Sequence, residues 1–190
     1  MAVELMKLRL DKYLADMGIG TRTEVKKAIT KGQVRVNEET VKRPEIKIDT
    51  EKDHVFYQGQ MVAYAEYEYY MLNKPAGVVS ATEDKNDSTV LDLIDEKQRK
   101  DLFPVGRLDK DTEGLLLITN DGELAHQLLS PKKHVDKVYF ARIDGKVTEE
   151  DVRRFAEGLE VGEEKPTLPA HLEILKSEEI SKIRLTIREG

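Results

Sequence analysis

The stretch that decides the fold of this chain is GRLDKDTEGLLLITNDG, residues 106–122. It begins as a polar loop in which glycines flank three carboxylates, and it continues as an apolar run that ends at Thr119. An apolar run of this length predicts a strand that is buried on both faces. Side chains on a loop that a rigid strand anchors often carry function. A charged surface loop without chemistry would have the same composition, so the stretch alone leaves both interpretations open.

The residues around this stretch predict the rest of a domain. Strands are expected at residues 69–72, 138–143, 172–175 and 183–187. Short helices are expected at residues 89–94, 124–129 and 148–156, and Thr89 is placed to cap the first of them. Strands interleaved with peripheral helices predict an α+β fold with a mixed antiparallel sheet, which we place at residues 69–190.

The N-terminal residues follow a different pattern. Apolar residues at positions 10, 13, 14 and 17 have the spacing of one buried helix stripe. Thr21 and Glu24 form the pattern of a capping box at the start of a second helix, and Gly32 is suited to end that helix. Val34 and Val36 alternate with a charged residue, as in a half-buried strand, and residues 58–60 suggest a hairpin turn. We therefore expect a small αα-β domain at residues 1–60 and a linker at residues 61–68.

The composition excludes several classes of protein and site. The chain has no cysteine, which excludes disulfides and thiolate metal sites, and its four histidines are scattered without a close pair. No apolar run approaches the roughly 20 residues of a membrane helix, and the N-terminus lacks the apolar stretch of a signal peptide. We expect a cytoplasmic monomer that binds no metal and does not enter a membrane.

The net charge of −6 hides an uneven distribution. Residues 1–50 carry 11 Lys and Arg against 8 Asp and Glu, a net of +3, whereas the remaining residues carry 20 against 29, a net of −9. Contacts with phosphates depend on local basic surface, so the first fifty residues are the better candidate for binding nucleic acid. An ordinary solvated helix face would give the same excess.

The helix pair followed by small strands resembles the S4-like RNA-binding module, which is also found in bacterial tyrosyl-tRNA synthetases. In that family the helix pair and the following turn hold structured RNA. The resemblance implies RNA binding here without indicating which RNA. It places the RNA contacts on six polar residues: Arg9, Lys12, Arg22, Thr23, Lys26 and Lys27.

Three motifs resemble the bacterial ribosomal RNA pseudouridine synthases, in the branch with this N-terminal module. The first is Gly-Arg-Leu-Asp at residues 106–109, followed by Asp-Thr-x-Gly-Leu-Leu-Leu and Thr-Asn-Asp-Gly. The second is Leu-Asn-Lys-Pro-x-Gly at residues 72–77. The third is Ser130-Pro131 followed by Lys-Val-Tyr at residues 137–139. Their order and spacing agree with the family over nearly the whole chain.

The resemblance implies the site residues and their roles. Asp109 is the expected catalytic carboxylate, and Asp111 and Glu113 are acidic alternatives that only the family pattern disfavours. Tyr139 is expected to stack on the uracil, and Arg107 to enter the RNA stack when the target base flips out. Lys74 is expected on the floor of the cleft, as an RNA contact or as a structural ion pair. The chemistry needs neither a metal nor a redox cofactor.

The substrate implied by the resemblance is a uridine of ribosomal RNA. Residues 69–75 and 165–173 favour the subgroup that acts on 16S rRNA in a pre-ribosomal particle, with 23S rRNA as the alternative. Two other functions remain open at this point: a non-catalytic ribosome-assembly factor, and a hydrolase with paired acids. In the family, a strand that ends in Glu-Gly continues into a segment that supplies a basic partner for the carboxylate. Because this chain ends at Glu189-Gly190, we expect the C-terminal end of the domain to be missing.

Overall fold

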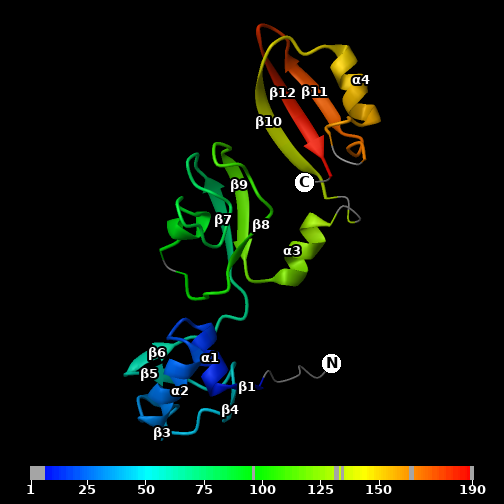
Figure 1. Ribbon diagram of the computed structural model, residues 1–190. Helices are drawn as coiled ribbons and strands as arrows, with labels where there is room; N and C mark the ends of the chain where they lie inside the picture. The colour runs from blue at the N-terminus through cyan, green and yellow to red at the C-terminus, as the bar shows by residue number, and fades with distance from the viewer. Residues whose placement is uncertain (1–6, 96, 131–132, 134, 163–164, 189–190) are drawn as a thin grey trace. The chain divides into compact units, whose positions relative to one another are not determined.

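The computed structural model describes residues 7–95, 97–130, 133, 135–162 and 165–188. The chain divides into two compact units, Met1–Asp121 and Gly122–Gly190 (Figure 1). Pro131 of the third motif and the terminal Glu189-Gly190 pair lie outside the described residues. In the described part of the chain, no helix is long and apolar enough to cross a membrane.

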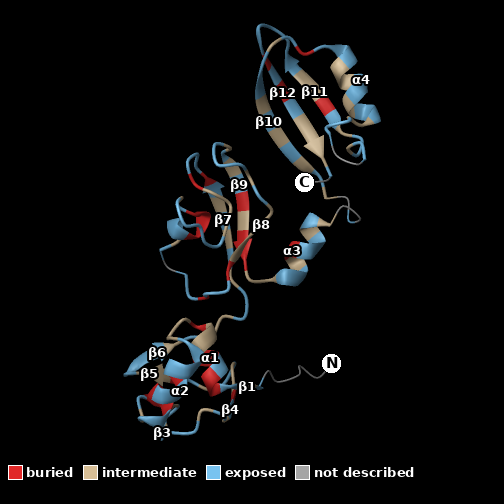
Figure 2. Ribbon diagram, viewed as in Figure 1, coloured by how far each residue is buried: buried red, intermediate tan, exposed pale blue. Residues whose placement is uncertain are grey.

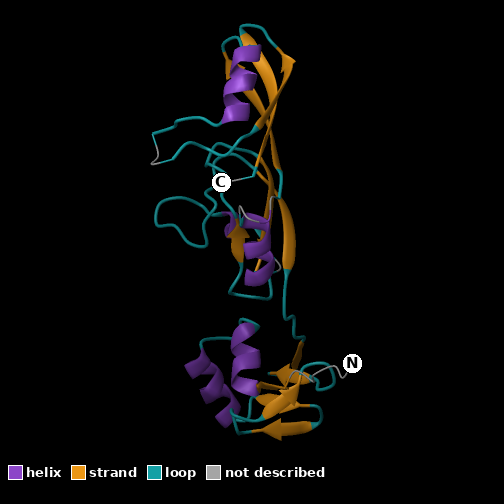
Figure 3. Ribbon diagram, turned by 90° about the vertical axis from the view of Figure 1, so that its right-hand side faces the viewer, coloured by secondary structure: helices purple, strands orange, loops and turns teal. Residues whose placement is uncertain are grey.

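The first unit begins with the two predicted helices, α1 (Leu10–Asp16) and α2 (Arg22–Thr30). The capping box of α2 is confirmed, because the Glu24 amide donates to Thr21 Oγ1 and the Glu24 carboxylate accepts from the Thr21 amide. Both helices lie on one side of the strands that follow (Figure 3). Their apolar residues and those of the strands form one core around Tyr13, Leu14 and Ile29.

The strands beside these helices form two small antiparallel sheets. The larger sheet has the order β3-β2-β5-β6, and β1 pairs with β4 in the smaller one. The predicted hairpin turn is confirmed: Gln58 and Gly59, both with positive φ, join β5 to β6. The bounds are β1 (Lys7–Arg9), β2 (Val34–Val36), β3 (Glu39–Val41), β4 (Lys47–Asp49), β5 (Val55–Tyr57) and β6 (Gln60–Val62).

A third antiparallel sheet completes the first unit. Its order is β7-β9-β8, with β7 at Tyr69–Lys74, β8 at Phe103–Val105 and β9 at Gly114–Thr119. The short 3₁₀ helix η1 (Val90–Leu93) follows Thr89, which forms a capping box with Asp92. The core of this part includes Val90, Leu116 and Ile118. The predicted strand and the short capped helix are therefore confirmed.

The prediction that the apolar run is buried on both faces is wrong. Leu116 and Ile118 of β9 are buried, but Leu115 is 72% exposed (Figure 2). The cause is the pleat, because successive side chains of a strand point to opposite faces. Within the first unit the hydrophobic core covers only the face that carries Leu116 and Ile118.

The second unit is a three-stranded antiparallel sheet with helices. The sheet has the order β10-β12-β11, with β10 at Lys137–Asp144, β11 at His171–Lys176 and β12 at Ile180–Ile187. Helix α3 (Gly122–Leu129) begins the unit, and α4 (Glu149–Glu157) contributes Val152 and Phe155 to the core of the sheet. Taken together, the elements of both units confirm the predicted α+β class.

Candidate active site and RNA-binding surface

The carboxylate loop, residues 106–113, joins β8 to β9, which are neighbouring antiparallel strands. Gly106 and Gly114 stand at its ends with φ of 87° and 134°, values that L side chains rarely adopt. Inside the loop the Thr112 amide donates to the Asp109 carbonyl at 3.1 Å, which closes a turn. The side chain of Asp109 is exposed at this turn. The loop therefore presents a carboxylate to solvent from a defined backbone conformation.

The buried side chain of Lys74 holds this loop from within. Its Nζ donates to the carbonyl oxygens of Asp109 and Thr112, both at 2.8 Å, and of Lys110 and Pro75, both at 3.2 Å. The residue is 0% exposed. An isolated buried charge is costly, but here the three donors of the ammonium are shared among four oxygens. A positive charge inside a loop with three carboxylates also reduces their mutual repulsion.

This geometry corrects the expected role of Lys74. A fully buried ammonium offers no surface to RNA, so it is not a substrate contact. It is not part of an ion pair in the described structure either, because its hydrogen-bond partners there are all carbonyl oxygens. Lys74 ends β7 directly opposite Gly114 of β9, which brings its side chain beneath the loop. Lys74 is therefore a positioning residue.

Three further residues in the segment 77–87 fasten the loop. The Gly77 amide donates to the Lys110 carbonyl at 2.7 Å. The hydroxyl of Ser80 accepts from the Leu108 amide at 3.0 Å and donates to the Leu108 carbonyl at 2.8 Å. The Lys110 ammonium forms an ion pair with Asp87 at 2.6 Å. Backbone groups on both sides of Asp109 are thus held by separate anchors.

Exposed cations at the end of β1 and on α2 gather around one buried acid, Asp11. Its carboxylate pairs with Arg9 at 2.8 Å, Arg22 at 3.7 Å and Lys26 at 3.9 Å, and its side chain is 0% exposed. Burial works to raise the pKa of Asp11, but hydrogen bonds from Arg9 and the charges of Arg9 and Arg22 outweigh it, so the pKa lies below its usual value. Sequence analysis did not single out Asp11.

The other three residues expected to contact RNA also lie on the helix pair. Lys12 is exposed on α1 and forms an ion pair with Asp16 at 3.0 Å. Thr23 and Lys27 are exposed on α2. Together with the cluster around Asp11, they give the helix pair a cationic surface. We refer to five of the six residues as the helix cations: Arg9, Lys12, Arg22, Lys26 and Lys27. The sixth, Thr23, is uncharged and lies next to Arg22.

Known proteins resemble this chain over nearly its whole length. Residues 68–190 match the RNA pseudouridylate synthase family, and residues 8–55 match the S4 domain. The chain belongs to the RNA pseudouridine synthase family. An uncharacterised RNA pseudouridine synthase of Bacillus subtilis is 45% identical over 96% of this chain and 77% of the relative. The ribosomal small subunit pseudouridine synthase A of Haemophilus influenzae is 38% identical over 96% and 78%.

Two further proteins are similar to this chain, one named for the large ribosomal subunit and one with a solved structure. The ribosomal large subunit pseudouridine synthase B of Bacillus subtilis is 38% identical over 96% of this synthase and 75% of that protein. A solved crystal structure of a pseudouridylate synthase matches with a TM-score of 0.60 at 38% identity, over 96% of this chain and 78% of that one. Relatives named for both ribosomal subunits are therefore similar to this synthase.

Two other residues expected at the active site lie in different units of the synthase. Arg107 is exposed on the carboxylate loop of the first unit, two residues before Asp109. Tyr139 lies on β10 of the second unit, opposite Leu185 of β12, and is half-buried. By alternation it shares a face with Ala141, which packs against the core beneath α4. The meeting of Tyr139 with Asp109 at one uridine stays a prediction.

Proposed function

We propose that this synthase converts a uridine of 16S ribosomal RNA to pseudouridine, with Asp109 as the catalytic carboxylate. The observation that carries the proposal is the carboxylate loop, in which separate anchors hold the backbone around an exposed Asp109. Reactions at a ribose need a charged group in a defined position, because effective catalysis depends on orientation. Asp111 and Glu113 lie on the same loop, but only Asp109 occupies the position of the family's Gly-Arg-Leu-Asp motif.

The reaction rearranges one nucleotide without a net gain or loss of atoms. The bond between ribose C1′ and uracil N1 breaks, the base turns, and a bond forms between C1′ and C5. The proton on C5 leaves, and N1 carries a proton in the product. We infer that Asp109 acts on the ribose, that the Tyr139 ring stacks on the uracil, and that Arg107 occupies the space left in the RNA when the uridine flips out.

The proposal assigns a function to each part of the chain. Residues 1–60, with the last two residues of β6, bind RNA as an S4-like domain; residues 63–68 form the linker, and residues 69–190 carry out the isomerisation. The helix cations bind phosphates of structured RNA, since clustered Lys and Arg supply the favourable electrostatic contribution to RNA binding. We further propose that the synthase works as a monomer in the cytoplasm, on 16S rRNA in a pre-ribosomal particle.

A second candidate substrate is 23S rRNA, which the similarity to a large subunit synthase favours. The test uses 16S and 23S rRNA, free and in ribosomal precursors, as substrates for the wild-type synthase. Pseudouridine is mapped by carbodiimide adducts and primer extension. Modification of a single 16S uridine supports the proposal, and modification of 23S rRNA alone contradicts the 16S assignment. Tight binding to both without modification would contradict the catalytic role.

A further inference from the structure

The outer face of the four-stranded sheet in the S4 domain carries a row of four residues that no role above uses. The strand registers place Thr40 opposite Arg35, Arg35 opposite Phe56, and Phe56 opposite Met61. Neighbouring residues of the same strands, such as Val34 and Val55, belong to the domain core. Because side chains alternate along a strand, the row points away from that core and away from the helices. We refer to these four residues as the outer row.

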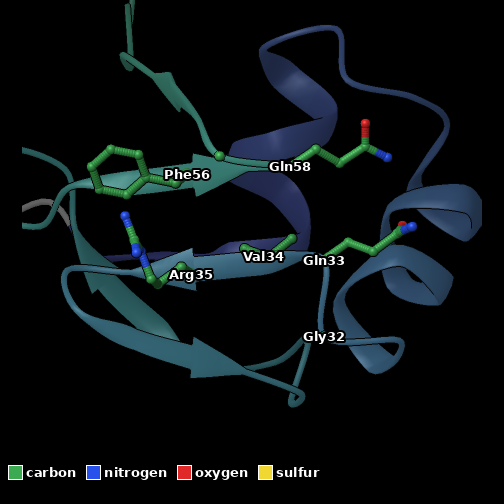
Figure 4. A pocket seen from close by; sticks show the side chains of 7 residues that line it. Gly32, Gln33, Val34, Arg35, Phe56 and Gln58 are labelled. Carbon is green, nitrogen blue, oxygen red and sulfur yellow. The ribbon is translucent and has the colours of Figure 1, made fainter.

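The centre of the outer row is a stacked pair. The guanidinium carbon of Arg35 lies 4.7 Å from the centre of the Phe56 ring, and the Arg35 side chain rises toward that ring (Figure 4). Arg35 is exposed, and none of the ion pairs in the described part of the chain involves it. Met61 at the end of the row is 57% exposed. A flat cation, an aromatic ring and a thioether therefore lie side by side on an accessible surface.

A hollow beside this pair adds polar groups. Its volume is about 280 Å³, and Gln33 and Gln58 line it together with Arg35 and Phe56. Both glutamine side chains extend beyond the end of the strands, at the edge of the hollow (Figure 4). Lys42 is also near, since a β-carbon placed on Gly32 would lie 3.6 Å from Lys42 Cε. The hollow thus combines one aromatic face with amide donors and acceptors and a second cation.

We propose that the outer row and this hollow bind one unpaired nucleotide of the RNA substrate. Unpaired bases stack on aromatic rings and on arginine planes, and amide side chains form hydrogen bonds with their edges. The volume of the hollow, about 280 Å³, lies near the lower end of the about 300–1,000 Å³ typical of small-molecule sites, so a single base fits it. Arg35 and Lys42 supply positive charge for the adjacent phosphates.

This inference rests on the proposed function and deepens it. The helices lie on one side of the sheet (Figure 3), and strand alternation places the outer row on the other side. One straight duplex therefore does not reach both. Structured RNA held by the helix cations and an unpaired segment held by the outer row would be two separate parts of the substrate. The S4 domain would then distinguish a helix that continues into a single strand from a plain duplex.

The test measures binding of two fluorescein-labelled RNAs by anisotropy: a single-stranded octamer and a blunt-ended duplex without unpaired nucleotides. Two variants, Phe56→Leu and Arg35→Gln, remove the aromatic face and the cation separately. We expect each to weaken octamer binding by about 5- to 150-fold, the loss of one stacked base, and to leave duplex binding unchanged. Lys52→Gln is the matched control, because it removes one positive charge from an exposed turn of the same domain. This control substitution should weaken the binding of both RNAs slightly and to the same extent.

The outcomes separate this inference from the proposed function. Octamer affinities within twofold of wild type in both variants, at unchanged melting temperature, would overturn the inference while modification of rRNA still supports the function. If Phe56→Leu lowers the melting temperature, Arg35→Gln decides, because its exposed side chain contributes little to the core. Equal losses for both RNAs would also overturn the inference, since they would indicate a general change in charge. If rRNA is not modified at all, the function fails, and octamer binding still tests the outer row.

Discussion

Replacing Lys74 with methionine should disturb both stability and catalysis, because this side chain holds the carboxylate loop from within. The substitution keeps the length of the side chain and removes the ammonium, so the carbonyls of Asp109, Lys110 and Thr112 each lose one donor. The Asp109 and Lys110 carbonyls keep their bonds from backbone amides, whereas the described structure gives the Thr112 carbonyl no second bond outside regular secondary structure. Leaving a buried acceptor without its hydrogen bond costs about 1–3 kcal/mol. Stability is typically only about 5–15 kcal/mol, so we expect a large fall in melting temperature.

The effect of this substitution on the rate follows from the remaining anchors. Misplacing a catalytic group by 1 Å costs on the order of 100-fold. The Gly77 and Ser80 contacts still hold the loop after the substitution. We therefore expect kcat per folded molecule to fall by roughly 10- to 100-fold, within the limit set by misplacement, and RNA affinity to change little.

The control for this experiment is Lys110→Met on the same loop. Its ion pair with Asp87 is half-exposed, and such pairs contribute about 0–1 kcal/mol. Thermal unfolding gives the folded fraction, single-turnover rates give the chemical step, and hydrogen exchange of the Thr112 amide reports on the turn. If Lys74→Met reacts at the wild-type rate per folded molecule with unchanged exchange at Thr112, Lys74 does not position the loop.

Three other substitutions test the remaining claims. Asp109→Asn should abolish isomerisation and change the free energy of RNA binding by less than about 1 kcal/mol, as surface substitutions do. Asp111→Asn should retain activity. Normal turnover by Asp109→Asn would contradict the central proposal. A triple variant should carry alanine in place of three cations of α2: Arg22, Lys26 and Lys27. It should reduce the slope of log affinity against log salt, because fewer counterions are released. Its reaction rate at saturating RNA should equal that of the wild type. Asp11→Asn should lower the melting temperature near neutral pH. Because the pKa of Asp11 is lowered in the folded state, its contribution is present above the usual aspartate value and is lost as the pH falls through the folded-state pKa. The difference between variant and wild type should therefore shrink in acid, and a constant difference would contradict the role of the charge.

The elements that the sequence predicted are those with strong local signals. The first two helices have a clear apolar stripe and a capping box, and both signals act within a few residues. The strand β8 was missed because it is three residues long and contains Pro104, which argues against a strand. Proline is tolerated there because β8 lies at the edge of its sheet. The strand β1 was missed because its partner residues in β4 are 38 or more positions away in sequence. No local pattern marks β1 as a strand.

The active-site loop was predictable as a motif but not as a structure. The motif located Asp109, whereas the anchors come from residues 28 to 38 positions away, and their partners are backbone carbonyls and amides without a sequence signature. The burial of β9 was misjudged for a related reason. Three successive leucines indicate an apolar strand, but which faces are covered depends on how the remaining elements pack.

Lys74 and Asp11 show why the type of a residue did not reveal its role. Sequence analysis treated lysines as candidate RNA contacts and did not consider an acid in the basic region. In the structure the lysine is buried beneath the acidic loop and the acid is buried among the cations. Each buried charge is opposite in sign to the exposed groups that it organises, so it holds them in place and reduces their mutual repulsion. The exposed acids near Asp109 and the exposed cations near Arg22 each lie close to one buried group of opposite charge, whose role could be recognised only from its burial in the fold.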